Sequence, residues 1–392
     1  MEHHLYMEAS EAADTLGVSI ATLYSYVSRK GLRSFPTPGT RRRRYWRADI
    51  LGLLDPSGTD VHTRSATTRI TLLTETGTYY RGHDVVALAD TASVEEVAAL
   101  LWQASANDIF TDRLPNTPAG FVAITRALRD SPSQDRTMAL LPLIERANPR
   151  AFDLSPSGFA AAGADALRWM TALTLGMDGP VTDPIAQTVA RTAGAPSELA
   201  DLVRRALVLI ADHEFAATTY AVRAAACTGL TPYAAVLVGL VAGSGQREKI
   251  QRYEAVRRLV FEILTAEDPA DPIISRFRTA EPLPGYETLA IHASGDRRAR
   301  ALMDACRMVL GDDPRFGRLM KATEVVYDLT QGEPGIVVLL TFLGQRLGLA
   351  GNELALGTIG RAIGWIAHAQ EAMLQPAAAR TLKTAYVGPL PS

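Results

Sequence analysis

The sequence predicts a mainly α-helical protein with a short β segment at the entry to its main body. From Ser93 onward, apolar residues recur with helical spacing, and strands do not alternate with helices. A polar stretch containing Pro and Gly, residues 55–68, separates this region from a basic N-terminal segment. The chain has 392 residues, 47% of them hydrophobic, which is enough for a large core and more than one domain.

Residues 1–54 are predicted to form a small domain with two helices and a hairpin. An amphipathic helix over 8–16 is followed by a tight turn, and Ser19 is placed to cap a second helix over 20–29. Residues 31–46 then predict a hairpin-like wing. The core expected between the helices consists of Ala12, Leu16, Val18, Leu23 and Val27. Two such helices followed by a wing form the winged helix-turn-helix pattern.

The charge of this domain favours DNA binding. Residues 29–47 carry eight basic residues and no acidic one, although the whole chain has a formal net charge of −2. Neutralising phosphates requires a local field of this kind. The domain resembles the winged helix-turn-helix domains of the MerR and excisionase families. Its predicted DNA contacts are Ser19, Thr22, Tyr24, Arg41, Arg42, Arg43 and Arg44. A dimerisation or regulatory module without affinity for DNA is the alternative.

Residues 55–68 are predicted to be a linker, and residues 69–392 the main body. Short strands over 69–74 and 76–81 begin the body, and Ser93 with Glu96 gives a capping-box signal. Helical periodicity covers the rest. The expected helices span residues 93–104, 116–129, 134–147, 156–175, 183–193, 197–228 (with a break near His213 left open), 231–241, 247–265, 270–279, 296–309, 314–330, 333–347 and 351–374.

The segment 207–229 predicts a long, largely buried helix that contains three adjacent polar residues, Asp212, His213 and Glu214. An unpaired buried polar group costs about 1–3 kcal/mol, so these residues need partners. Other helices or a bound polar molecule would supply them. Taken alone, the stretch is explained most simply by a core histidine bonded to a neighbouring turn.

The same stretch also carries a family pattern. Ala211-Asp-His-Glu214, followed by Thr218, Thr219 and Arg223, resembles A-D-H-E-x-N-x-S-T-x-x-x-R of the citrate synthase family, in which the His contacts oxaloacetate. Further stretches similar to family motifs are Tyr79-Tyr-Arg-Gly-His-Asp84 with residues 93–102, Gly295-Asp-Arg-Arg-Ala299, and Gly360-Arg-Ala-Ile-Gly-Trp-Ile-Ala-His-Ala-Gln-Glu371. Together they cover about residues 65–392 in the family's order.

The resemblance implies a two-part helical body, in which a small domain of roughly residues 230–330 interrupts a large one and closes over the substrate. It implies a reaction that joins the methyl carbon of an acyl-CoA thioester to the ketone of oxaloacetate, without a further cofactor. A coenzyme A thioester is thus an expected substrate or ligand. His213, Arg298 and Arg361 would bind the acid, since a guanidinium can hold a carboxylate bidentately.

The positions that carry the family's chemistry are replaced. Gln246 stands where the family has the His on the thioester oxygen, Thr288 where it has the His on the ketone, and Val337 where it has the Asp base. Val337 cannot accept a proton, and Thr288 cannot act as a cationic donor. His292 lies four residues beyond Thr288 and is a candidate substitute. No catalytic residue is therefore assigned.

Three functions are compatible with these observations. The first is a catalytically impaired family member that acts as a dimeric regulator, sensing a small di- or tricarboxylic acid and binding DNA. The second is an active citrate or 2-methylcitrate synthase-type acyltransferase. The third is a non-catalytic partner in a heterodimer with an intact citrate synthase paralogue. The replaced positions favour the first and third, and the basic wing favours the first over the third.

The cysteine content, the N-terminus and the length of the apolar runs indicate the cellular compartment. Two cysteines in apolar helical context, Cys227 and Cys306, predict a reducing cytoplasm rather than a disulfide framework or a metal site. The N-terminus lacks the basic and apolar regions of a signal peptide, and no apolar run is long enough to predict a membrane span. Phosphate-binding, dinucleotide-binding, HExxH and GxSxG motifs are also absent.

Overall fold

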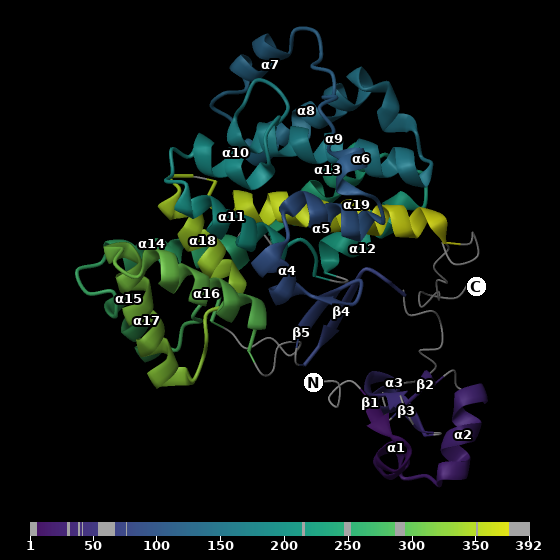
Figure 1. Ribbon diagram of the computed structural model, residues 1–392. Helices are drawn as coiled ribbons and strands as arrows, with labels where there is room; N and C mark the ends of the chain where they lie inside the picture. The colour runs from purple at the N-terminus through teal and green to yellow at the C-terminus, as the bar shows by residue number, and fades with distance from the viewer. Residues whose placement is uncertain are drawn as a thin grey trace, which may run out of the picture. The chain divides into compact units, whose positions relative to one another are not determined.

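The computed structural model describes residues 6–29, 32–37, 40, 42–53, 67–75, 77–213, 216–246, 252–286, 295–349 and 352–375. The chain divides into two compact units, Met1–Thr67 and Thr68–Ser392. Helices dominate both the sequence order and the ribbon in Figure 1, so the predicted mainly α class is confirmed. The predicted linker, residues 55–68, falls almost entirely outside the described residues.

Two short helices joined by a turn begin the N-terminal unit. Helix α1 (Ala9–Leu16) ends at Gly17, whose φ of 64° is a left-handed conformation that glycine adopts without steric cost. Helix α2 (Ile20–Arg29) follows after two further residues. The Thr22 backbone N–H donates to Ser19 Oγ at 3.1 Å, so the predicted cap of α2 is confirmed.

A three-stranded antiparallel sheet completes this unit. Its order is β1 (Tyr6–Glu8), β3 (Arg43–Trp46), β2 (Ser34–Pro36), and α3 (Arg47–Gly52) follows directly. Strands β2 and β3 pair as the predicted hairpin, whereas β1 was not predicted. The predicted core residues Ala12 and Leu23 are fully buried, and Leu16, Val18 and Val27 are partly buried and pack against them. Among the described residues of the unit, Met7, Ala13, Leu32, Tyr45 and Ile50 are also buried.

The body begins with a second antiparallel sheet. Strands β4 (Thr71–Thr74), β5 (Gly77–Tyr80) and β6 (His83–Asp84) pair in sequence order, which confirms the two predicted strands. Asp84 caps α4 (Val85–Thr91), because its Oδ1 accepts from the Val86 N–H at 2.8 Å. The sheet brings Thr71 opposite Tyr80, and both side chains point into the body.

The larger helical group of the body packs around α19. Ser93 and Glu96 form the predicted capping box at the start of α5. Helices α9 and α19 have 20 residues each, and most of their side chains are buried, as expected for helices surrounded by others. The group comprises α5 (Val94–Trp102), α6 (Ala106–Ile109), α7 (Phe121–Ala127), α8 (Ser133–Ala147), the 3-10 helix η1 (Pro149–Phe152), α9 (Pro156–Leu175), α10 (Ile185–Thr192), α11 (Glu198–Leu209), α12 (Ala217–Ala226), α13 (Pro232–Gly243) and α19 (Ala355–Leu374).

A smaller group of helices lies to one side of these (Figure 1). It comprises α14 (Ala255–Thr265), α15 (Asp271–Arg278), α16 (Arg297–Leu310), α17 (Pro314–Thr330) and α18 (Ile336–Arg346). Helix α13 packs on α12, α8 and α19, whereas α18 packs on α14 and α16. The small group therefore begins beyond residue 243 and extends to residue 346, somewhat later at both ends than the expected range of 230–330.

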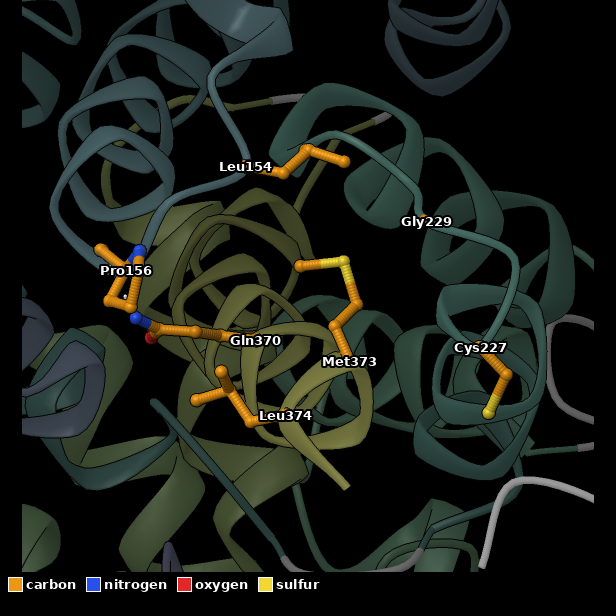
Figure 2. Close-up of a pocket in the computed structure, with 7 residues that line it drawn as sticks. All are labelled: Leu154, Pro156, Cys227, Gly229, Gln370, Met373 and Leu374. Carbon is orange, nitrogen blue, oxygen red and sulfur yellow. Dashed lines mark hydrogen bonds between the residues drawn. The ribbon is translucent and has the colours of Figure 1, made fainter. Parts of the chain in front are cut away.

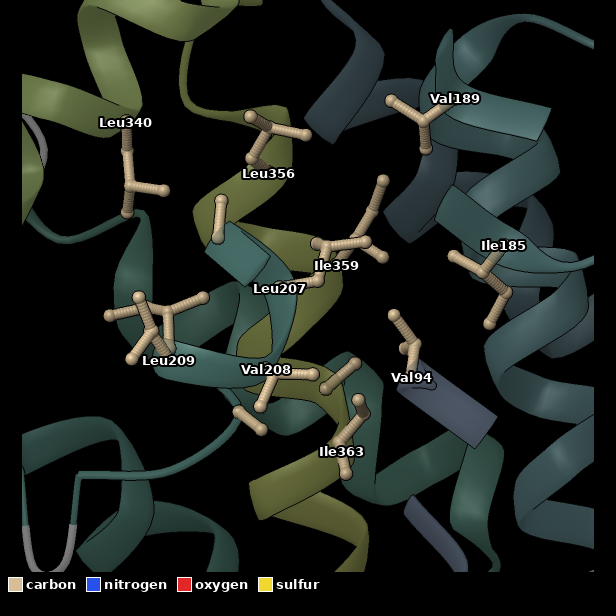
Figure 3. Close-up of a cluster of buried hydrophobic side chains, with 14 of the residues drawn as sticks. Val94, Ile185, Val189, Leu207, Val208, Leu209, Leu340, Leu356, Ile359 and Ile363 are labelled. Carbon is tan, nitrogen blue, oxygen red and sulfur yellow. The ribbon is translucent and has the colours of Figure 1, made fainter. Parts of the chain in front are cut away.

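The two groups share a continuous hydrophobic core. Figure 3 shows side chains of α11, α18 and α19 at its centre, with Leu207, Leu340 and Ile359 among them. In the described part of the chain, Cys227 and Cys306 are free thiols. No helix there combines the length and apolar character needed to cross a membrane.

Candidate functional site

The polar run at Asp212 lies between two helices rather than within one. Helix α11 ends at Leu209 and α12 begins at Ala217, so the prediction of a continuous helix over 207–229 was wrong and the break near His213 is confirmed. The neighbouring helix α19 contacts the chain at this break, where the Gly364 N–H donates to the Ala211 carbonyl at 2.9 Å. A Cβ at Gly364 would lie 2.3 Å from Asp212 Oδ1, so only glycine allows this approach.

Asp212 is fully buried and is the centre of a polar network. Its Oδ2 accepts from Thr71 Oγ1 at 2.6 Å and lies 3.1 Å from His368 Nε2. Its Oδ1 accepts from Arg361 Nη1 at 2.9 Å. The Tyr80 hydroxyl accepts from the Asp212 backbone N–H at 2.9 Å and donates to the Asp212 carbonyl at 3.0 Å. Strands β4 and β5 and helix α19 thus all supply partners for one residue.

His368 joins Asp212 to a second ion pair. Arg223 Nη1 lies 3.0 Å from His368 Nδ1 and donates to Glu371 Oε2 at 2.6 Å. Because a guanidinium can only donate, Nδ1 must accept, and the ring proton lies on Nε2, which faces Asp212. Glu371 Oε1 also accepts from the Arg69 backbone N–H at 2.7 Å. We call Thr71, Asp212, Thr219, Arg223, Arg361, His368 and Glu371 the Asp212 network.

The network holds Asp212 as a carboxylate. Burial by itself opposes ionisation, but the charge of Arg361 and the hydrogen bonds from His368 and Thr71 outweigh it, and they lower the pKa of Asp212 well below its ordinary value of 3.8. The neighbouring Tyr80 shows the opposite effect, since its burial raises the pKa of the hydroxyl. Tyr80 therefore stays protonated and can donate its hydrogen bonds.

The depressed pKa of Asp212 predicts a pH-dependent stability. Because the folded-state pKa lies below the unfolded value, the carboxylate stabilises the fold fully above the unfolded pKa, and this contribution is lost as pH falls through the folded pKa. The difference in unfolding free energy between wild type and Asp212→Asn should therefore shrink on acidification from about pH 6 to about pH 3, as measured by urea denaturation. A constant difference would show that Asp212 is not the titrating group.

Of the three predicted acid-binding residues, Arg361 belongs to this network, and His213 adjoins it in the sequence. His213 is half-buried and directly follows Asp212. The Arg361 side chain is 13% exposed, and its Nη2 also donates to Thr219 Oγ1 at 2.9 Å. Arg298 is buried in α16 and pairs with Asp296 at 2.9 Å. The positive charge of Arg298 is close enough to Tyr80 to offset part of the rise in the pKa of the Tyr80 hydroxyl that burial causes.

Three of the described guanidinium groups in this part of the body have a carboxylate partner. Arg361 pairs with Asp212, Arg223 with Glu371 and Arg298 with Asp296. A carboxylate ligand that binds Arg361 must therefore compete with Asp212 for the same N–H groups. A ligand carboxylate could therefore replace the Asp212 carboxylate at Arg361. In each of these three pairs, however, one carboxylate balances the charge of one guanidinium.

Of the positions expected to carry catalysis, the structure describes Val337 and Gln246, and neither side chain is a base. Val337 lies in the first turn of α18 and packs against the hydrophobic core. Gln246 is exposed just beyond α13. Thr288 and His292 lie outside the described residues, as does Arg41 of the predicted DNA contacts. No cluster of three or more potential metal ligands occurs in the described parts of the chain.

The other predicted DNA contacts are spread over α2 and the β2–β3 hairpin. Ser19 and Thr22 share a hydrogen bond of 2.8 Å, and Tyr24 is 55% exposed. Arg42 and Arg43 are exposed, and the half-buried Arg44 stacks on the Tyr6 ring at 4.1 Å. Two other arginines of the basic run are paired within the unit, Arg33 with Asp49 and Arg47 with Glu11.

A cavity of about 240 Å³ opens elsewhere in the body, at the C-terminal end of α19. Figure 2 shows its lining, which consists of Leu154, Pro156, Cys227, Gly229, Gln370, Met373 and Leu374. It contains none of the residues predicted to bind acid or CoA. Gln370 lies nine residues after Arg361, which is about 13 Å along the helix axis.

Thr71 and His368 were not predicted from the sequence to belong to this site. Arg361, His368 and Glu371 are spaced by seven and three residues, so they share one face of a helix, and this spacing was available in the sequence. Thr71 lies 141 residues before Asp212, and no local pattern signals such a contact. Residues 360–371 resemble a family motif, but the resemblance assigns a role in acid binding only to Arg361.

The match to a family model defines the class of protein. A family model described as the C-terminal domain of citrate synthase matches residues 60–382. The chain therefore belongs to the citrate synthase family. A search of curated proteins found none that matches this chain.

Solved structures of citrate synthases share the fold. The enzyme from Thermotoga maritima is 19% identical, with a TM-score of 0.65, and the match covers 86% of this chain and 95% of that one. The Thermoplasma acidophilum enzyme, solved as a ternary complex with carboxymethyl coenzyme A and oxaloacetate, is 19% identical with a TM-score of 0.68, covering 85% and 96%. The Pyrobaculum aerophilum enzyme is 17% identical with a TM-score of 0.67, covering 91% and 95%.

Proposed function

We propose that this chain is a DNA-binding regulator in which a citrate synthase-type body binds a small di- or tricarboxylic acid without converting it. The observation that carries the proposal is Val337, an apolar residue packed against the core at the position assigned to the general base. A condensation of this type begins with removal of a weakly acidic C–H proton, and no side chain of this kind can accept one.

The acid-binding part of the proposal rests on Arg361 and His213. Arg361 lies at the edge of the Asp212 network, and its guanidinium has the geometry for bidentate carboxylate recognition. His213 directly follows Asp212 in the sequence and is half-buried. Binding would replace the internal Asp212–Arg361 pair by a pair with the ligand, so that the acid changes contacts inside the body as it binds.

The DNA-binding part rests on the N-terminal unit. Two helices joined by a turn, with the second capped by Ser19, fit the helix-turn-helix arrangement, and the β2–β3 hairpin fits its wing. Tyr24 on α2 and Arg42 and Arg43 near the hairpin are exposed. A homodimer would present two such units to a pseudo-palindromic site.

Ligand-induced stabilisation tests acid binding. Citrate or oxaloacetate should raise the thermal unfolding midpoint of the wild type, since a ligand at 100 times its Kd stabilises by about 2.7 kcal/mol. His213→Ala and Arg361→Gln should abolish the shift. His83→Ala changes an exposed histidine of β6 and should retain it. A wild type that responds to no di- or tricarboxylate would remove the sensing role.

An active acyltransferase is the second candidate. It is favoured by the fold shared with the Thermoplasma acidophilum enzyme, whose complex holds carboxymethyl coenzyme A and oxaloacetate. Such an activity would need Gln246 or His292 in new roles, with a coenzyme A thioester as substrate. A non-catalytic heterodimer with a citrate synthase paralogue is the third, and purification with such a paralogue would identify it.

A further inference from the structure

The first residues of the body are tied to the Asp212 network at two points. The Arg69 backbone N–H donates to Glu371, and two residues later the Thr71 hydroxyl donates to Asp212. The body begins at Thr68, so both contacts lie directly after the segment that joins it to the N-terminal unit. A change in the network therefore acts directly on Arg69 and Thr71, where the chain enters the body.

Both contacts are made to carboxylates that are held by arginines of the same network. Asp212 pairs with Arg361, and Glu371 pairs with Arg223. His368 connects the two pairs, with Nε2 facing Asp212 and Nδ1 facing Arg223. The Asp212, His368 and Arg223 side chains are buried, so one of them cannot lose a partner without the others rearranging, because unpaired buried charges are costly.

We infer that Asp212 and Glu371 couple ligand binding at Arg361 to residues 69–71, where the chain enters the body from the N-terminal unit. The ligand in this inference is the carboxylic acid of the proposed function, on which it rests. An acid that takes the Arg361 N–H groups leaves Asp212 without its cation. Asp212 then also loses a donor that fixes its orientation, so the hydrogen bond from Thr71 to Asp212 and, through His368, the bond from the Arg69 N–H to Glu371 can rearrange. Acid binding thus shifts the population between a state in which residues 69–71 are bonded to the Asp212 network and a state in which they are released from it.

The test reads hydrogen exchange at the Arg69 amide in the full-length protein. Arg361→Gln removes the cation from Asp212, and it should speed Arg69 exchange by about tenfold relative to exchange at the core amide of Leu259 in α14. Arg346→Gln is the matched control, because it breaks another partly buried Arg–Asp pair, with Asp313, in α18. It should leave the Arg69 ratio unchanged.

A milder variant guards against loss of folding. Thr219→Val removes only the hydroxyl that accepts from Arg361, and it should speed Arg69 exchange in the same direction but less. If neither Arg361→Gln nor Thr219→Val exceeds Arg346→Gln in its effect on the Arg69 ratio, the coupling is wrong.

Citrate added to the wild type separates this inference from the proposed function. Faster Arg69 exchange with citrate supports both. Faster exchange in the variants but no effect of citrate or oxaloacetate on the wild type leaves the coupling standing and removes acid sensing. Citrate binding that stabilises the protein without changing Arg69 exchange overturns the coupling and leaves acid binding intact.

Discussion

Replacing Asp212 with alanine is expected to destabilise the body by about 3–5 kcal/mol, because removing one member of a buried ion pair leaves its partner uncompensated. Asp212 is fully buried, and its carboxylate bonds to Arg361, Thr71 and His368. The alanine variant would remove this shared partner from all three side chains. Urea denaturation followed by the fluorescence of Trp102 and Trp169, both buried in the body, measures the change.

Asp304→Ala is the matched control for this effect. Asp304 pairs with Arg307 in α16 at 3.0 Å, but the two side chains are 65% and 53% exposed. An exposed pair contributes about 0–1 kcal/mol, so this variant should unfold close to the wild type. Equal losses in Asp212→Ala and Asp304→Ala would contradict the central place of Asp212.

Replacing Arg41, Arg42, Arg43 and Arg44 with alanine is expected to abolish specific DNA retention. Each phosphate contact contributes a slope of about −0.9 in the dependence of log affinity on log salt, so the quadruple variant should lose up to about 3–4 of that slope. Fluorescence anisotropy with a DNA pool selected by the wild type, titrated at several salt concentrations, measures both quantities. Unchanged binding would exclude the hairpin from DNA recognition.

Two comparisons make the DNA experiment specific. Arg126→Ala with Arg129→Ala removes two exposed arginines of the body and should leave DNA binding unchanged. Arg47→Gln removes an arginine that is paired with Glu11, so it should weaken binding less than Arg42→Ala. Circular dichroism of the quadruple variant checks that Arg43 and Arg44, which contact Ser34 and Tyr6, are not needed for folding.

The helical elements were predictable where local signals are strong. Helix α9 begins and ends at the predicted residues, because Ser155 caps it and Gly176 follows it in a left-handed conformation. The capping box at Ser93 likewise placed α5. The short helices α4 and α6 and the strand β1 were not predicted, since three to seven residues carry too little periodicity to be recognised.

The candidate site was predictable only in part. The sequence indicated that Asp212 and its neighbours need polar partners, and the resemblance selected Arg361. The actual partners, Thr71 and His368, come from segments 141 and 156 residues away. The continuous helix over 207–229 was wrong, and its interruption lies where Ala211 and Asp212 contact Gly364 of α19, a residue distant in the sequence.

The loss of catalysis is tested most directly by the release of free CoA thiol. Purified protein receives oxaloacetate with acetyl-CoA and then with propionyl-CoA, and a known citrate synthase serves as the positive control. With Val337 at the position of the base, we expect no turnover above that of the Gln246→Ala, His292→Ala double variant, together with thermal stabilisation by oxaloacetate in the same sample. Turnover clearly above that background would contradict the proposal that this body binds an acid without converting it.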